Sequence, residues 1–247
     1  MPSLSPYKSD LDYAYAPGIF PAMECLLHRP DSARRVLLHS KAEGTEGAEK
    51  LTRLAEQLHV RVEIADKALA RISGKENCFA AAVFAKFDDA LAGDRPHVVL
   101  HHPSDCGNVG TILRTADAAG FDGALLSSAC ADLYGAKTLR ATMGSVFRVP
   151  VRRTADLPAA LEEMKARGYA IVATELGGAD FYAHCPHERA VLVIGSEGNG
   201  VSAAVREVAT HHLALPMRGG AESLNAAVAA GIMIYEMARA VPLHQTE

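Results

Sequence analysis

Apolar runs alternate with amphipathic segments along the second part of the chain. Runs bounded by glycine, proline and polar residues predict strands at residues 97–102, 123–127, 146–151, 169–174, 190–194 and 212–215. Segments whose apolar residues recur every three or four positions predict helices at residues 108–119, 134–140, 157–167, 202–208 and 223–240. Strands that alternate with helices in this way indicate an α/β fold with a mostly parallel sheet.

The first part of the chain shows a shorter version of the same pattern. Here we expect strands at residues 35–39, 60–65 and 79–87 and helices at residues 21–28 and 48–58. Residues 88–95 mix charged and small side chains, which is typical of a linker. We therefore expect two domains, a small α/β domain at residues 1–93 and a larger one at residues 94–247.

Composition narrows the classes of function. The net charge of −4 means that any contact with nucleic acid must come from a local positive patch. Five cysteines without a Cys-x-x-Cys pair favour a reducing compartment. The polar residues 1–16 lack the apolar core of a signal peptide, and the apolar residues 226–235 are half the roughly 20 that a membrane span needs. We expect a cytoplasmic protein without a membrane segment.

Three polar segments follow predicted strands and lead towards helices, at residues 108–116, 194–200 and 215–225. Ligands of open α/β sheets bind at such strand ends, so the polar side chains of these segments form one candidate site. They are Asn108, Arg114, Glu197, Ser223 and Asn225.

Each of these segments also has a purely structural interpretation. Asn108 and Ser223 would serve as helix N-caps, and residues 195–200 would be an ordinary glycine-rich turn. Two side chains are harder to explain in that way. The Glu197 carboxylate needs a partner, for which Arg114 is a candidate, and the Asn225 amide needs hydrogen-bond partners at the start of an apolar helix.

In this order, the three segments resemble the signature motifs of the SpoU (TrmH-like) family of RNA ribose methyltransferases, which belongs to the SPOUT superfamily. The resemblance covers residues 97–247 and includes the stretches 137–144 and 147–150. Residues 18–87 more weakly resemble the small α/β RNA-binding domain of many members. There, Glu76-Asn77-Cys78-Phe79 stands where that domain often has Asn-His-Gln-Gly.

The resemblance implies a deep trefoil knot and a bound S-adenosylmethionine, held by the loops after Ile194 and Leu215. It also implies a homodimer formed through the C-terminal domain. Carried over by motif, the expected cofactor contacts are Gly195, Leu215, Leu224 and Asn225, with Thr174, Ser196 and Met217 as neighbours.

The implied reaction is methyl transfer to a ribose 2′-hydroxyl of transfer RNA or ribosomal RNA. The family assigns proton removal to the arginine that matches Arg114, held by Asn108 and Glu197. Because a guanidinium keeps its proton at any physiological pH, it is a poor proton acceptor, and we interpret its role as electrostatic stabilisation of the developing alkoxide. Ser223 and Asn225 would then position the ribose or the cofactor.

A local patch provides the expected contact with RNA. No acidic residue occurs between Asp132 and Asp156, whereas five cationic residues do. They are Lys137, Arg140, Arg148, Arg152 and Arg153. The alternative interpretation of this patch is a solvated rim.

Two other classes of function compete with the methyltransferase. A nucleotide-dependent dehydrogenase would need a Gly-x-Gly-x-x-Gly turn, which the chain lacks. A non-catalytic RNA-binding or ribosome-assembly protein would keep the fold, but the presence of all five polar site residues favours the enzyme. The pairs His101-His102 and His211-His212 lack the spacing of a metal-binding motif, so we expect no metal.

Overall fold

The computed structural model describes residues 4–73 and 78–241, so Glu76 and Asn77 of the N-terminal resemblance lie outside the described residues. Contacts within the chain divide it into two compact units. The first unit consists of Met1–Phe87 and Asp132–Arg148, and the second of Asp88–Ala131 and Val149–Glu247. Unlike the expected division at residue 93, this one groups residues 132–148 with the N-terminal part of the chain.

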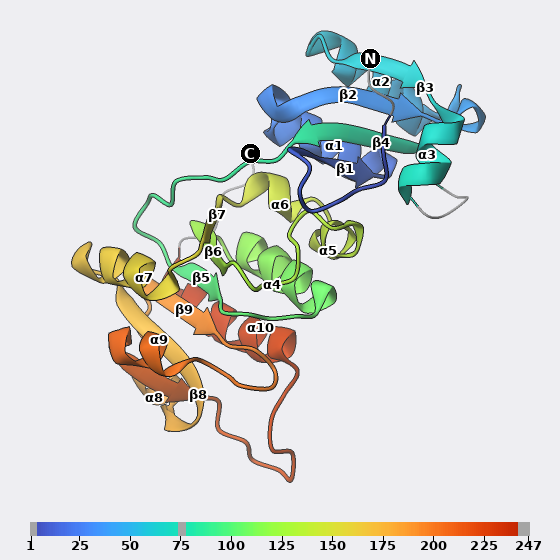
Figure 1. The fold of residues 1–247 in the computed structure, drawn as a ribbon. Helices are drawn as coiled ribbons and strands as arrows, with labels where there is room; N and C mark the ends of the chain where they lie inside the picture. Colours follow the sequence, from blue (N-terminus) through green and yellow to red (C-terminus); the bar gives the residue numbers. More distant parts are fainter. Residues whose placement is uncertain (1–3, 74–77, 242–247) are drawn as a thin grey trace. The chain divides into compact units, whose positions relative to one another are not determined.

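The first unit contains a four-stranded sheet in the order β1-β4-β2-β3, drawn in Figure 1. Its strands are β1 (Tyr13–Pro17), β2 (Ala33–Leu38), β3 (Arg61–Ile64) and β4 (Ala80–Ala85). Strand β4 is antiparallel to β1 and β2, while β2 and β3 are parallel. The sequence pattern missed β1, whose buried residues are only Ala14, Tyr15 and Ala16 and so give little hydrophobic signal.

Helices α1 (Ile19–His28), α2 (Glu46–Gln57) and α3 (Asp66–Ser73) and the short 3-10 helices η1 (Pro30–Ser32) and η2 (Ser40–Ala42) complete the N-terminal part of the first unit. Helix α3 was also missed, because it starts two residues after β3 without a separating turn signal. Its Leu69 is fully buried and packs in one cluster with Tyr15, Leu37 and Val83.

Residues 132–148 form α5 (Ala136–Thr142) and α6 (Ser145–Arg148) and pack within the first unit. Phe147 and Tyr134 join Phe84 and Phe87 in an aromatic cluster, in which the Phe84 and Phe147 ring centroids are 5.1 Å apart. Arg148 forms an ion pair with Glu24 of α1. The expected strand at residues 146–151 is therefore wrong, because periodicity cannot separate a short buried helix from a strand.

The second unit is built on a six-stranded sheet in the order β10-β8-β9-β5-β6-β7, and every neighbouring pair is parallel. The expectation of a mostly parallel sheet is confirmed. The strands are β5 (His97–Leu100), β6 (Gly123–Ser127), β7 (Val151–Thr154), β8 (Ala170–Asp180), β9 (Ala190–Ile194) and β10 (His211–Ala214).

Helices cover this sheet in two pairs. Helix α7 (Leu157–Ala166) packs with α9 (Ala203–Val208), and α4 (Cys106–Ala118) packs with α10 (Ala226–Met237). The α7–α9 pair shares a core with Val99, Leu125 and Val191 of the sheet. Because side chains alternate along a strand, Val98 and Leu100 face the opposite side, where Figure 1 shows α4 and α10. The short α8 (Phe181–His184) and η3 (Ala238–Ala240) follow β8 and α10.

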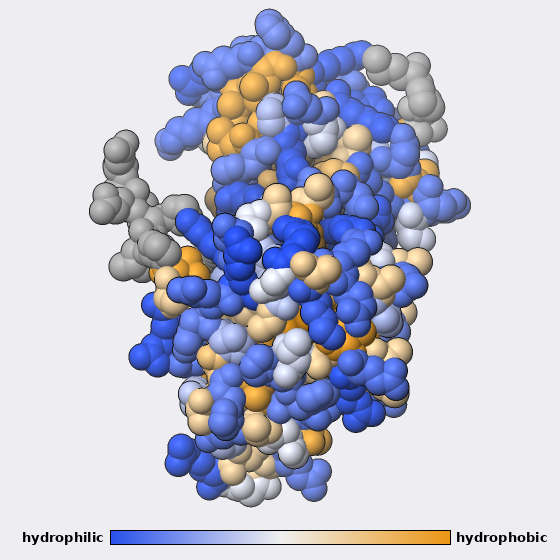
Figure 2. Space-filling view, turned by 90° about the vertical axis from the view of Figure 1, so that its left-hand side faces the viewer, coloured by the Kyte–Doolittle hydropathy of each residue, from blue (hydrophilic) through white to orange (hydrophobic). Residues whose placement is uncertain are grey.

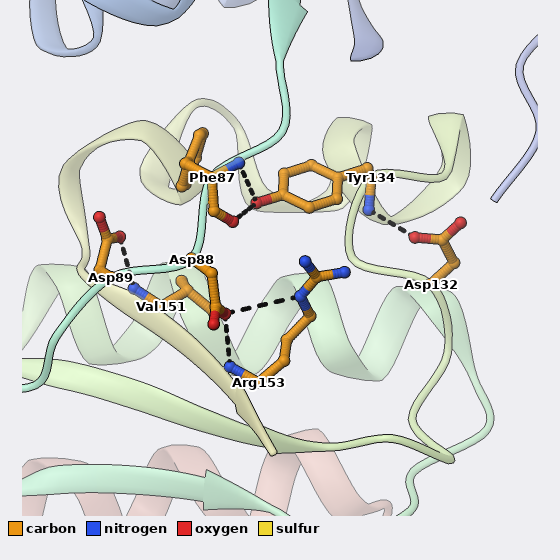
Figure 3. Close-up of polar contacts among 7 residues, drawn as sticks. All are labelled: Phe87, Asp88, Asp89, Asp132, Tyr134, Val151 and Arg153. Carbon is orange, nitrogen blue, oxygen red and sulfur yellow. Dashed lines mark hydrogen bonds and ion pairs between the residues drawn. The ribbon is translucent and has the colours of Figure 1, made fainter. Parts of the chain in front are cut away.

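The expected linker is an ordered part of the second unit. Figure 3 shows Asp88 and Asp89 beside β7, the edge strand of the sheet. The Asp89 carboxylate accepts a hydrogen bond from the Val151 N–H at 2.9 Å, and the Asp88 carboxylate accepts one from the Arg153 N–H at 2.7 Å. These carboxylates occupy edge N–H groups that would otherwise be open to another strand.

On the face drawn in Figure 2, hydrophobic residues form small separate patches among hydrophilic ones. None of the helices within the described residues has the length and apolar character needed to cross a bilayer.

The packing of residues 132–148 within the first unit yields a stability prediction. We expect Phe147→Ala to lower the free energy of unfolding by about 3–5 kcal/mol, because its buried ring would leave a cavity beside Phe84. Phe79→Ala is the matched control, since the Phe79 ring is exposed and its loss should have a small effect. Urea denaturation measures both variants, and equal losses would contradict the assignment of this segment to the first unit.

Candidate active site

Helix α4 begins with a cap that the sequence analysis assigned to another residue. Asp105 is the N-cap, and its carboxylate accepts a hydrogen bond from the backbone N–H of Asn108 at 2.7 Å. The interpretation of Asn108 as the cap is therefore wrong. Asp and Asn are both strong cap formers, and the pattern alone does not separate them. Because Asp105 caps the helix, the side-chain amide of Asn108 is available for contacts outside it.

Helix α10 also begins later than expected. Asn225 is its N-cap, and the Asn225 Oδ1 atom accepts hydrogen bonds from the N–H groups of Ala227 at 2.9 Å and Val228 at 3.3 Å. Ser223 lies outside the helix, so its assignment as the cap is wrong. The Asn225 amide was expected to need hydrogen-bond partners. The first N–H groups of its own helix are the partners of its oxygen.

Two further hydrogen bonds join three separate segments of the second unit. The Nδ2 atom of Asn225 donates to the Oδ1 atom of Asn108 at 3.1 Å. The Nδ2 atom of Asn108 then donates to the Oε1 atom of Glu197 at 2.7 Å. We call this series of contacts the amide chain. It brings together the starts of α4 and α10 and the turn after β9.

The orientation of each amide in this chain is fixed by chemistry. Helix N–H groups can only be accepted by an oxygen, so Asn225 must direct its oxygen towards α10 and its NH2 group towards Asn108. Asn108 must then accept with its oxygen and donate its NH2 group to the acceptor-only carboxylate of Glu197. All dipoles point the same way, so the partial positive charge of the α10 N-terminus is relayed towards the carboxylate.

The turn after β9 presents Glu197. Ser196 and Gly200 exchange two backbone hydrogen bonds of 2.9 and 3.1 Å, which close the turn around Glu197, Gly198 and Asn199. A Cβ atom on Gly195 would lie 2.2 Å from the carbonyl carbon of Gly200. The closure of the turn itself therefore requires glycine at position 195, independently of any approach by a ligand.

Arg114 and Ser223 lie apart from the amide chain. Within residues 4–73 and 78–241, neither side chain forms a hydrogen bond or ion pair, and both are exposed. The expected ion pair between Arg114 and Glu197 is absent from this part of the chain. Arg114 follows Asn108 by six residues, which places it roughly 240° further around the axis of α4. It therefore points away from the Asn108 side of the helix.

The expected cofactor contacts lie on or after three neighbouring strands, β10, β8 and β9, and Thr174 is inside β8, level with the end of β9. The Thr174 hydroxyl donates to the carbonyl of Val193 at 2.9 Å, which ties β8 to β9. Met217 and Leu224 expose part of their apolar side chains after β10, and Leu176 of β8 is 80% exposed. Leu176 was not predicted from the sequence, because its only signal is an apolar residue between Glu175 and the pair Gly177-Gly178.

These features suit a ligand with a flat apolar ring and polar groups. Exposed apolar side chains on β8 and after β10 are of the kind that such a ring would cover, and the closed turn at residues 195–200 offers backbone polar groups after β9. Among the described residues, no group of three His, Cys, Asp or Glu side chains is placed to hold a metal ion.

His101 is the most buried titratable side chain next to this region. Its backbone N–H donates to the carbonyl of Ile194 at 2.8 Å, and its ring stacks on His102 with 4.1 Å between centroids. Burial lowers the pKa of His101, and the neighbouring His102 lowers it further. A neutral imidazole is therefore favoured at the point where the chain leaves β5.

The five cationic residues of the expected RNA patch do not form one free surface. Arg148 pairs with Glu24, Arg152 with Glu163 and Arg153 with Asp88. Only Lys137 and Arg140, both exposed on α5, have no such partner among the residues that the structure describes. Acidic residues distant in the sequence explain the difference, and a linear charge pattern cannot show them.

Known proteins share both the sequence and the fold. A model of the SpoU rRNA Methylase family matches residues 95–235. The chain is 42% identical over 158 residues to the 23S rRNA (guanosine(2553)-2'-O)-methyltransferase RlmP of Bacillus subtilis (strain 168), which covers 64% of this chain and 63% of that protein. It is 35% identical over 191 residues to an uncharacterized tRNA/rRNA methyltransferase of Synechocystis, covering 75% of this chain and 69% of that one.

A solved structure extends the similarity to nearly the whole chain. The SpoU methyltransferase AviRb from Streptomyces viridochromogenes, in complex with AdoMet, has a TM-score of 0.81 and 27% sequence identity. The match covers 92% of this chain and 90% of that chain. It therefore includes more than the residues that the family model matches.

The cap assignments yield a prediction with an internal control. We expect Asn225→Ala to lower the free energy of unfolding by about 1–2 kcal/mol, because α10 loses its cap and the Asn108 oxygen loses its donor. Ser223→Ala should have almost no effect, since Ser223 forms no such bond. Thermal and urea denaturation measure both, and a loss for Ser223→Ala as large as that for Asn225→Ala would contradict the assignment.

Proposed function

Because the chain belongs to the SpoU rRNA methylase family, we propose that it transfers the methyl group of S-adenosylmethionine to a ribose 2′-hydroxyl of RNA. The observation that carries this proposal is the amide chain, which joins three polar motif residues from distant segments. The similarity to RlmP, a ribosomal RNA 2′-O-methyltransferase by name, favours ribosomal RNA as the substrate. The similarity to AviRb, solved with AdoMet, supports the cofactor.

S-adenosylmethionine supplies a methyl group bonded to a positively charged sulfur, ready for attack by an oxygen. The residues that would hold it lie inside β8 or in the segments after β9 and β10, and they are Thr174, Gly195, Ser196, Leu215, Met217, Leu224 and Asn225. A trefoil knot of the loops after β9 and β10 would enclose it. The first unit would serve as the RNA-binding domain.

Alignment of the reacting groups would supply much of the rate acceleration, since an in-line displacement needs little covalent help. S-adenosylmethionine would give its methyl group to the ribose oxygen and keep the electron pair of the carbon–sulfur bond on sulfur, while the hydroxyl proton would pass to water. Asn108 donates a hydrogen bond to the Oε1 atom of Glu197, and the second carboxylate oxygen would accept from a substrate hydroxyl or pair with a guanidinium. Ser223 would position the ribose, and a cation beside the 2′-oxygen would stabilise its developing negative charge.

Arg114 would provide that cation from a second copy of the chain. It lies on an exposed side of α4. Helix α4 packs against α10, where Thr115 of α4 lies next to Gly231 of α10. On the same stretch of α10, Val228, Ile232 and Tyr235 expose large apolar side chains. An apolar face of this kind is typical of a subunit interface. A homodimer through α4 and α10 would cover it and would carry Arg114 towards the partner's Glu197.

Replacement of Arg114 tests its role in the reaction. We expect Arg114→Ala to lower the rate of methyl transfer to ribosomal RNA roughly a hundredfold or more, because the developing charge loses its cation. Calorimetry should show an unchanged affinity for S-adenosylmethionine. Lys50→Ala, which removes an exposed cation paired with Glu46, is the control. Transfer near the wild-type rate would exclude Arg114 from the reaction, and a wild-type chain that binds no S-adenosylmethionine would overturn the proposed function.

Mixed dimers test whether Arg114 acts across the interface. Arg114→Ala and Glu197→Gln chains should each be strongly impaired alone, since every site of each homodimer lacks one group. When the two are unfolded together and refolded, a mixed dimer regains one complete site if the arginine comes from the partner. Methyl transfer should therefore reappear in the mixture. If both groups act within one chain, the mixture stays strongly impaired.

A further inference from the structure

Within the described residues, one face of the first unit carries large apolar side chains that are about half exposed. Phe20 and Leu27 of α1 are 50% and 52% exposed, and seven residues apart on a helix they lie on the same side. Met143, in the turn between α5 and α6, is 46% exposed. Glu24 lies between Phe20 and Leu27 along α1, and a Cβ on Gly144 would lie 2.7 Å from its Cγ atom. The Met143-Gly144 turn thus borders the exposed side of α1, and we call this surface the α1–α5 face.

Met143 has a backbone conformation in which a side chain is unusual. Met143 is the C-cap of α5 and adopts the left-handed conformation, with φ 48° and ψ 41°. Glycine adopts this conformation without steric cost and is the usual residue at such a helix end. The fold therefore gives no reason for methionine at this position. A flexible, polarisable side chain held at the surface suits contact with a partner.

Charge indicates the kind of partner. Residues 19–29 and 133–148, which supply the face and its border, contain four cationic side chains and one carboxylate, in a chain whose net charge is −4. The carboxylate, Glu24, is already paired with Arg148. Lys137 and Arg140 on α5 have neither a hydrogen bond nor an ion pair within the described ranges. The face is therefore positive as well as apolar, and its two free cations suit phosphate groups.

We propose that the α1–α5 face holds an unpaired stretch of the RNA substrate. Phe20 and Met143 pack against one or two unstacked bases, and Lys137 and Arg140 bind the adjoining phosphates. Base stacking on exposed aromatic side chains beside a positive groove is the usual way to bind single-stranded RNA, whereas duplex RNA offers mainly phosphates and ribose hydroxyls. This inference rests on the proposed function and names the form of RNA that the first unit takes.

Fluorescence anisotropy with a short single-stranded oligoadenylate and a duplex of equal length tests the proposal. We expect the wild-type chain to prefer the single strand. Phe20→Ala and Met143→Gly should each weaken that binding roughly fivefold or more, the effect expected for loss of a stacked base. Met143→Gly should keep or raise the melting temperature, because glycine relieves the left-handed backbone. If Met143→Gly binds the oligoadenylate more weakly while its melting temperature is not lowered, Met143 acts in RNA binding and not in the stability of the fold.

The two free cations on α5 give a further prediction, and Lys50 and Ile64 provide the controls. In the double variant Lys137→Ala and Arg140→Ala, the slope of log affinity against log salt should become less negative by about 1.4, the value for two phosphate contacts on a single strand. Lys50→Ala and Ile64→Ala should leave the affinity for the single strand unchanged. Lys50 is paired with Glu46, and Ile64, which is 51% exposed, lies on β3 and not on the α1–α5 face. Unchanged affinity in Phe20→Ala and Met143→Gly would overturn the proposal, and so would an equal loss in Ile64→Ala.

Methyl transfer separates this inference from the proposed function. With ribosomal RNA as substrate, Phe20→Ala and Met143→Gly should raise the KM for RNA while kcat and the affinity for S-adenosylmethionine stay unchanged. A wild-type chain that transfers no methyl group would refute the proposed function, whatever its binding of oligoadenylate. Normal transfer by the wild type with the same KM in both variants would refute only the role of the α1–α5 face.

Discussion

The hydrogen bonds from Asn225 to Asn108 and from Asn108 to Glu197 link the N-terminus of α10 to a carboxylate on the turn after β9. Several parts of the second unit contribute to this connection. Asp105 caps α4 and so leaves the Asn108 side chain available. The closed turn at residues 195–200 requires Gly195 and presents Glu197, while the packing of α4 against α10 brings the two asparagines together. Loss of any of these features would break a hydrogen bond of the amide chain and leave one of its polar groups without a partner.

Residues 132–148 belong to the first unit, although in the sequence they lie between β6 and β7 of the second. The chain enters the first unit again after Ala131 and leaves it after Arg148. Within the first unit, the ring of Phe147 and the ion pair of Arg148 with Glu24 secure the segment. The same segment carries Lys137, Arg140 and Met143, so it supplies a large share of the surface that we assign to RNA. A positive surface can thus exist on a chain whose overall charge is negative.

Much of the second unit could be predicted from the sequence, because buried parallel strands give strong apolar runs and the motif glycines are local signals. The strand at residues 190–194 and the polar residues Asn108, Glu197 and Asn225 were found in this way. The errors have physical causes. Asp105 and Asn108 are equally good caps, the apolar run around Phe147 fits a helix as well as a strand, and β1 buries only three residues, two of them alanine. The partners of Arg148, Arg152 and Arg153 are distant in sequence, so only the folded chain reveals that these charges are paired.

A double-mutant cycle of Asn108→Ala and Glu197→Gln, measured as the rate of methyl transfer to ribosomal RNA at saturating S-adenosylmethionine, tests most directly whether the amide chain acts as one unit. If Asn108 acts by orienting Glu197, the double variant should be no slower than the slower single variant, because the second change removes nothing further. If the two losses multiply, the side chains act independently, and the amide chain is not the unit that orients Glu197 for the reaction.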